Sequence, residues 1–86
     1  MAKRGGATIK NYQVFYMDSC GLPSVLVKYP GEAPMRKAVE AEIEIRGCGE
    51  TLEEAFRRAR EVAGADTGVQ RILAQAEAEH IKPLFH

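Results

Sequence analysis

The sequence predicts a small α+β domain in which a three-stranded antiparallel sheet is packed by one helix and followed by a second helix, in the order βββαα. Three observations lead to this fold class. Two N-terminal segments are rich in β-branched and aromatic residues, a third alternates between apolar and charged residues, and the C-terminal half has apolar residues at helical spacing. A chain of 86 residues has room for one hydrophobic core, so residues 1–86 form a single domain.

Residues 9–17 and 24–29 are the first two predicted strands. The first combines Ile, Tyr, Val and Phe, and the second reads SVLVKY, and both compositions suit a pleated surface. Between them, the segment DSCGLP (residues 18–23) offers side chains that bond nearby backbone and a glycine that accepts positive φ, which predicts a turn and a hairpin. Residues 1–8 are small and polar, which predicts a flexible arm.

The third predicted strand covers residues 38–46, where apolar and charged residues alternate. The apolar set is Val39, Ala41, Ile43 and Ile45, and the charged set is Glu40, Glu42, Glu44 and Arg46. Period two places the first set on the buried face of the sheet and the second set on its wet face. The three carboxylates would then stand about 7 Å apart in a row. We expect an acidic strand face.

Two helices are predicted after this strand. Thr51 and Glu54 form a capping box at the start of the first helix, and Gly64 supplies its C-cap. Its apolar stripe consists of Leu52, Ala55, Phe56, Ala59, Val62 and Ala63. Asp66 or Thr67 caps a second helix that runs to about residue 81. We expect the strands to form a meander in chain order, with the first helix covering its buried side.

The net charge of zero hides segments of opposite sign. Residues 1–37 carry six bases and two acids, residues 38–54 carry six acids and one base, and the remaining residues carry five bases and four acids. Overall neutrality argues against a domain whose main work is to grip the nucleic-acid backbone. Because no stretch has about 18 consecutive apolar residues and no apolar run follows the first residues, we expect a cytoplasmic protein with no membrane segment.

Groups that could carry out catalysis are sparse. Only His80 and His86 are of the residue type that serves in acid–base catalysis near neutral pH, but neither has a recognisable Ser, Cys or Asp partner in the sequence. Cys20 and Cys48 both adjoin glycine in predicted turns, so a bridge between them stays open, although a reducing compartment favours thiols. These four residues lack the paired spacing of zinc sites, and the glycines form no phosphate-binding loop. We expect no enzyme, no metal and no cofactor.

The run GCGETLEEAFRRARE at residues 47–61 resembles the strand-to-helix junction of HicB-type antitoxins. In that family a short antiparallel meander ends in a glycine-cysteine turn, and a Gly-x-Thr-x-Glu-Glu-Ala helix start follows. The resemblance covers fifteen of the 86 residues and implies a meander packed by a helix, with a role in sequestering a protein or nuclease. Here the two motifs overlap, whereas the family spaces them by a few residues, and no catalytic residue is carried over.

The favoured function is a small non-enzymatic binding protein, an inhibitor or antitoxin-like protein that binds a nucleic-acid-processing partner such as a nuclease or a defence complex. Carboxylates at strand spacing imitate backbone phosphates and can occupy a basic groove. The predicted contact residues are Glu40, Glu42, Glu44, Glu50, Glu53 and Glu54. Small proteins of phages and mobile elements, such as anti-CRISPR proteins, are similar in size and charge. The alternative is that these glutamates only solubilise an exposed sheet face.

Two further hypotheses remain open. One is a small nucleic-acid-binding module that uses bases and stacking rings. Its contact residues would be Lys3, Arg4, Lys10, Tyr12, Tyr16, Arg57, Arg58 and Arg60. The other, compatible with either function, is a homodimer in which the first strand, apolar on both faces, is buried between two copies.

Overall fold

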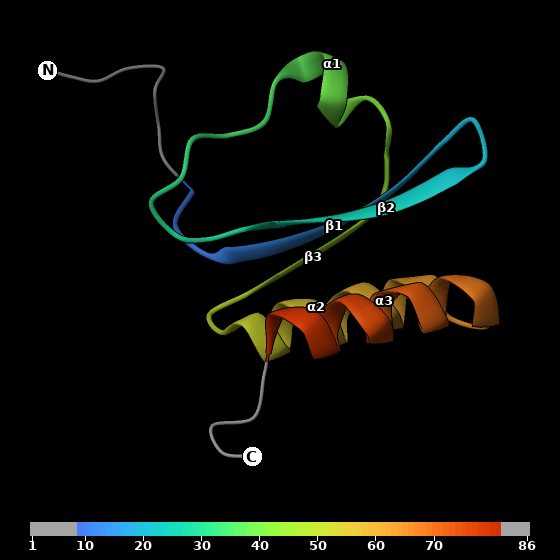
Figure 1. Cartoon of the computed structure of the whole chain (residues 1–86). Coiled ribbons are helices and arrows are strands. Elements are labelled where there is room, and N and C mark those ends of the chain that lie inside the picture. Colours follow the sequence, from blue (N-terminus) through green and yellow to red (C-terminus); the bar gives the residue numbers. More distant parts are fainter. Residues whose placement is uncertain (1–8, 82–86) are drawn as a thin grey trace, which may run out of the picture.

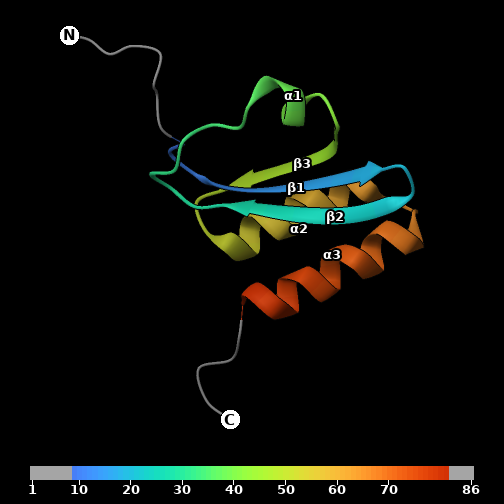
Figure 2. The ribbon, with the colours of Figure 1, turned by 45° about the horizontal axis from the view of Figure 1, so that its top comes forward.

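The structure is a computed structural model, and it describes residues 9–81. Its elements are β1 (Tyr12–Ser19), β2 (Leu22–Lys28), the one-turn helix α1 (Lys37–Glu40), β3 (Ile43–Gly49), α2 (Leu52–Ala63) and α3 (Thr67–His80). The strands form one antiparallel sheet, with α2 and α3 on one face and α1 on the opposite side (Figure 1, Figure 2). The predicted α+β class is confirmed. The predicted arm, residues 1–8, lies outside the described residues.

The strand order is β2-β1-β3, so the predicted meander is wrong. β1 is the central strand, and its Val14 pairs with Val27 of β2 on one side and with Gly47 of β3 on the other. A strand that is apolar on both faces suits this central place. β2 contains Pro23, which cannot donate to a ladder and therefore suits an edge strand. The connection over residues 29–42 is long enough to carry the chain across the sheet to the far edge of β1.

The predicted strand over residues 38–46 is wrong in its first half. The segment before Ile43 makes a helical turn, in which the Glu40 N–H donates to the Arg36 carbonyl at 2.9 Å and the Ala41 N–H donates to the Lys37 carbonyl at 3.0 Å. Ile43 already pairs with Met17, close to the hairpin end of β1. Beyond Met17, little of β1 remains to pair with the residues that precede Ile43. The backbone groups of these residues therefore form hydrogen bonds within a helical turn, which consists of good helix formers.

The hairpin between β1 and β2 is tighter than predicted. β1 begins at Tyr12 and runs to Ser19, and β2 begins at Leu22, so the turn shrinks to Cys20 and Gly21. Both residues have positive φ, 57° at Cys20 and 79° at Gly21. Two successive residues with positive φ match the type I′ turn, whose twist suits a two-residue hairpin.

The core lies between the sheet and the two long helices. Its fully buried members are Val14, Ala55, Phe56, Ala59 and Leu73, and Tyr16 joins them. On the opposite face of β1, Phe15 is only 3% exposed, and the Arg46 guanidinium lies 5.3 Å from its ring centroid. β1 is thus buried on both faces within one chain. The burial of this strand therefore needs no second copy, and the homodimer stays a prediction.

Helix α2 lies directly on β3, and two glycines allow this approach. A Cβ atom on Gly47 would stand 2.3 Å from the Ala55 carbonyl oxygen, and one on Gly49 would stand 2.7 Å from the Glu54 Cβ. Both distances are far below van der Waals contact, so only glycine fits. Within residues 9–81, no helix is both long and apolar enough to cross a membrane.

Candidate binding site

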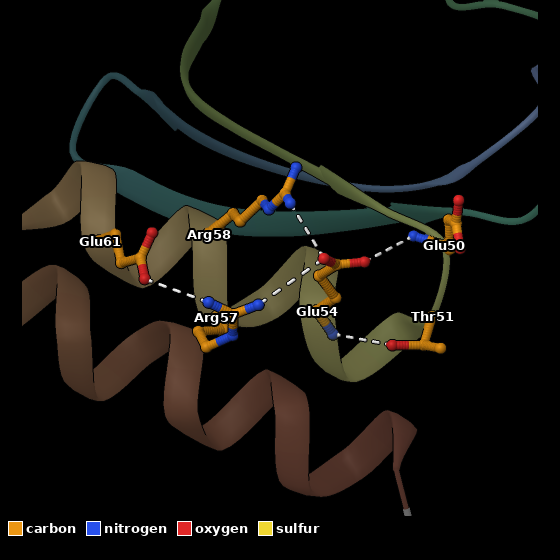
Figure 3. Close-up of polar contacts among 6 residues, drawn as sticks. All are labelled: Glu50, Thr51, Glu54, Arg57, Arg58 and Glu61. Atoms are coloured by element: carbon orange, nitrogen blue, oxygen red, sulfur yellow. Dashed lines mark hydrogen bonds and ion pairs between the residues drawn. The ribbon is translucent and has the colours of Figure 1, made fainter.

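The junction between β3 and α2 is built by the predicted capping residues. Thr51 Oγ1 accepts a hydrogen bond from the Glu54 N–H at 3.1 Å, which confirms Thr51 as the N-cap. The Glu54 carboxylate reaches back and accepts from the Glu50 N–H at 2.9 Å, one residue earlier than in the usual capping box (Figure 3). These bonds fix the backbone from Glu50 to Glu54 at the end of the sheet.

Glu54 is fully engaged within its own chain. Its carboxylate pairs with Arg58 at 2.9 Å and with Arg57 at 3.7 Å, and Arg57 also pairs with Glu61 at 3.4 Å (Figure 3). The hydrogen bond from the Glu50 backbone lowers the pKa of the Glu54 carboxyl, and Arg58 and Arg57 lower it further. Glu54 is therefore a structural carboxylate, although the sequence predicted it as a partner contact.

The predicted acidic row of Glu40, Glu42 and Glu44 does not form on a strand. Glu40 ends α1 and pairs with Arg46 at 3.4 Å, and Glu42 lies between α1 and β3. Glu44 lies in the strand, but at a bulge: Ile45 pairs with Tyr16 and Ile43 with Met17, which leaves Glu44 as the extra residue. A bulged residue does not continue a period-two face. The carboxylates therefore lack regular strand spacing.

Glu50 and Glu53 line a surface hollow of about 380 Å³. Its lining residues lie near the start of β1, the end of β2, the start of α2 and the end of α3, and Figures 1 and 2 show that these four chain segments are at the same end of the sheet. The hollow is also lined by Tyr12 and Tyr29, whose ring centroids are 5.7 Å apart in an edge-to-face arrangement. His80, at the end of α3, also lines the hollow. The hollow thus combines aromatic rings with two carboxylates.

Sequence reasoning found the carboxylates of this hollow but missed Tyr29 and His80 as site residues. A signal for Tyr29 was present. If the turn is placed at Cys20 and Gly21, the hairpin register sets Gln13 opposite Lys28, and Tyr29 then comes next to Tyr12. For His80 no sequence signal exists, because its position depends on how α3 packs against the sheet.

The residues predicted to contact nucleic acid do not gather into one basic surface. Tyr16 is only 4% exposed, so its ring is not open to stacking, and Tyr12 already contacts Tyr29. Arg57 and Arg58 pair with Glu54, and Arg60 pairs with Glu77 of α3. Lys10 is exposed, whereas residues 3 and 4 lie outside the described residues.

Tyr16 has a further electrostatic feature. Burial raises the pKa of its hydroxyl, and the carboxylates of Asp18, Glu44 and Asp66 raise it further. The neutral phenol is therefore favoured, which suits a residue whose ring packs in the core.

Cys20 and Cys48 are free thiols and lie at opposite ends of β1. Cys48 pairs with Gln13, whereas Cys20 follows the end of the strand at Ser19. Seven residues at strand spacing separate the two positions by roughly 20 Å, which excludes a bridge. In the part of the chain from residue 9 to residue 81, no three His, Cys, Asp or Glu residues gather in a way that could hold a metal ion.

Comparisons with known proteins add no family to this description. No protein-family model matches the chain, and the searches of curated proteins and of solved structures found no match. The resemblance of residues 47–61 to HicB-type antitoxins therefore stays a prediction.

Proposed function

We propose that this chain is a small non-enzymatic binding protein that occupies a basic groove of a nucleic-acid-processing protein, as an inhibitor or antitoxin would. The observation that carries the proposal is the uneven pairing of charges. Arg46, Arg57, Arg58 and Arg60 each pair with a carboxylate of their own chain. Within residues 9–81, several carboxylates near β3 form no ion pair, namely Glu42, Glu44, Glu50 and Glu53.

These four carboxylates form two acidic ends of one edge strand. Glu42 and Glu44 lie at the start of β3, and Glu50 and Glu53 lie after its end. The six steps of extended chain from Glu44 to Glu50 separate the two ends by roughly 20 Å. Grooves that hold nucleic acid are lined with Lys and Arg, so two separate acidic ends can meet two basic patches of such a groove. This arrangement replaces the continuous acidic row that the sequence predicted.

The bases that form no ion pair within residues 9–81 are less concentrated. Lys10 precedes β1, Arg36 and Lys37 belong to the turn of α1, and Arg71 lies in α3. Their dispersal, together with the burial of Tyr16, favours a basic partner over nucleic acid as the ligand. A defence complex or a nuclease has a groove of the required charge.

Affinity capture from the native cell tests the proposal, with the tagged full chain and two double variants as bait. One variant is Glu50→Gln with Glu53→Gln, and the other is Glu42→Gln with Glu44→Gln. We expect the wild type to recover a nucleic-acid-processing protein in a salt-sensitive manner, and each variant to recover less of it, because exposed charge pairs are screened by salt.

The matched control removes two other carboxylates of the helices, by Glu61→Gln with Glu79→Gln, and we expect it to retain the partner. Equal recovery by the wild type and both acidic-end variants would contradict the proposal. Recovery of nucleic acid alone would support the nucleic-acid-binding module in its place.

A further inference from the structure

We propose that the hollow between the two tyrosines and the start of α2 receives a cationic side chain of the partner, arginine in preference to lysine. This inference rests on the proposed function, because it names the group that one acidic end of β3 would bind. The hollow draws its lining from β1, α2 and α3 and from the segments that directly follow β2 and β3, all at one end of the sheet, so the fold itself holds its shape. Its volume, about 380 Å³, lies at the lower end of the range for ligand sites.

The aromatic wall suits a cation. The Tyr12 and Tyr29 rings stand edge to face, with 69° between their planes, so they present differently oriented surfaces to the hollow. Tyr29 is 38% exposed, which leaves part of its ring open to a ligand. Cations are attracted to the faces of aromatic rings by the ring quadrupole.

The charges around the hollow favour the same class of ligand. Glu50 and Glu53 bring two carboxylates, and neither forms an ion pair within the described part of the chain. The C-terminal end of α3, whose dipole favours cations, also borders the hollow. The N-terminus of α2 has the opposite dipole. However, Thr51 and the carboxylate of Glu54 already accept hydrogen bonds from backbone N–H groups of this junction.

An anion is disfavoured by the two carboxylates, and a neutral apolar group would leave them buried beneath it without a counter-charge. Arginine fits better than lysine because its planar guanidinium can stack on a tyrosine ring while donating two parallel hydrogen bonds to a carboxylate. The structure thus favours a guanidinium as the occupant.

The test is a titration of the ¹⁵N-labelled full chain, followed by backbone amide shifts. The probes are acetyl-Gly-Arg-Gly-amide, the same peptide with Lys, and inorganic phosphate. We expect the arginine peptide to give saturable shifts centred on the amides of Tyr12, Tyr29, Glu50 and Glu53, with a dissociation constant on the order of millimolar. The lysine peptide should bind more weakly, and phosphate should give no saturable shift there.

Two variants separate the ring from the charge. Tyr29→Leu removes an aromatic face, and Glu53→Gln removes a carboxylate. We expect each to weaken the arginine peptide by about 2- to 5-fold. Glu61→Gln, a carboxylate of the same helix outside the hollow, should leave binding unchanged. Retained dispersion of the amide spectrum shows that a variant is folded, and Glu53, which is exposed, provides a substitution that removes no packing.

The inference is overturned if the arginine peptide gives no saturable shift at these amides up to about 10 mM, or if phosphate binds there more tightly. Its failure differs from that of the proposed function. If the peptide does not bind but Glu50→Gln with Glu53→Gln still reduces partner capture, the guanidinium site is refuted and the proposed function is retained. If the peptide binds but neither acidic-end variant affects partner capture, the proposed function is refuted and the cation site is retained.

Discussion

Substitution of Gly47 by alanine should destabilise the domain by about 3 kcal/mol, at the upper end of the range for overpacked interiors. The added Cβ would lie 2.3 Å from the Ala55 carbonyl oxygen, 2.5 Å from the Ala59 nitrogen and 2.9 Å from the Ala59 Cβ. Ordinary contact begins at 3.4 Å. Two of these atoms belong to the α2 backbone and cannot rotate away, so relief requires α2 to move from β3 by about 1 Å.

Such a movement also loosens contacts that α2 makes elsewhere. Phe56 and Ala59 of this helix are fully buried, and a radial gap of about 1 Å forfeits up to half of the dispersion attraction across it. A domain of this size has a total stability of about 4 to 13 kcal/mol. We therefore expect the variant to unfold at a temperature lower by about 12 to 24 °C.

The matched control is the same substitution at Gly68, in the first turn of α3, where an added Cβ would find only the Asp66 carboxylate oxygen at 3.5 Å. This alanine should stabilise the protein by up to about 1 kcal/mol, because glycine is a poor helix former. Urea unfolding followed by circular dichroism measures both changes. If Gly47→Ala is within about 0.5 kcal/mol of the wild type, the close packing of α2 on β3 is refuted.

Three further perturbations test the interactions that hold the site. Thr51→Ala removes the N-cap of α2 and should cost about 1 kcal/mol in urea unfolding, whereas Thr67→Ala, beside the separate cap Asp66, should cost less; equal costs would contradict the cap. Because the folded pKa of Glu54 lies below its ordinary value of 4.5, its contribution is present above that pH and is lost as the pH falls through the folded pKa. In the Glu54→Gln variant the free energy of unfolding should therefore fall less steeply at acid pH than in the wild type. An equally steep fall would contradict the stabilising role of the Glu54 carboxylate. Because the folded pKa of Tyr16 is raised above 10.0, the free energy of unfolding should fall as the pH rises past that value. Tyr16→Phe should reduce this fall, and an identical fall in the variant and the wild type would refute the reasoning.

Local signals in the sequence predicted the C-terminal half of the fold. The caps at Thr51 and Asp66 and the end of α2 at Gly64 depend on residues within one turn of each other, and the structure has all three. The apolar stripe placed Phe56 and Ala59 correctly in the core. Such features need no knowledge of the rest of the chain.

Strand order and the extent of β3 depend on distant segments, and sequence reasoning was wrong there. Apolar residues on both faces of β1 led to the hypothesis of a second copy, although a central strand that is covered on both faces within one chain gives the same pattern. Alternation continued from Ile45 back to Val39, yet the ladder ends at Ile43 because β1 turns away soon after its partner Met17.

The candidate site was predicted in part for the same reason. Glu50 and Glu53 follow from local charge and lie at the hollow, whereas the place of Tyr29 depends on hairpin register and that of His80 on helix packing. Glu54 was predicted both as a capping residue and as a partner contact, and the structure shows its carboxylate engaged by the Glu50 N–H and by Arg58 of its own chain.

The most direct test of the proposed function is competition between this chain and nucleic acid for the captured partner. The purified partner is titrated calorimetrically with the full chain, first alone and then saturated with its own nucleic-acid substrate. If the acidic ends of β3 occupy the basic groove, the substrate should abolish binding, and the Glu50→Gln with Glu53→Gln variant should bind more weakly to the free partner. Equal affinity for the free and the substrate-bound partner would contradict the central claim.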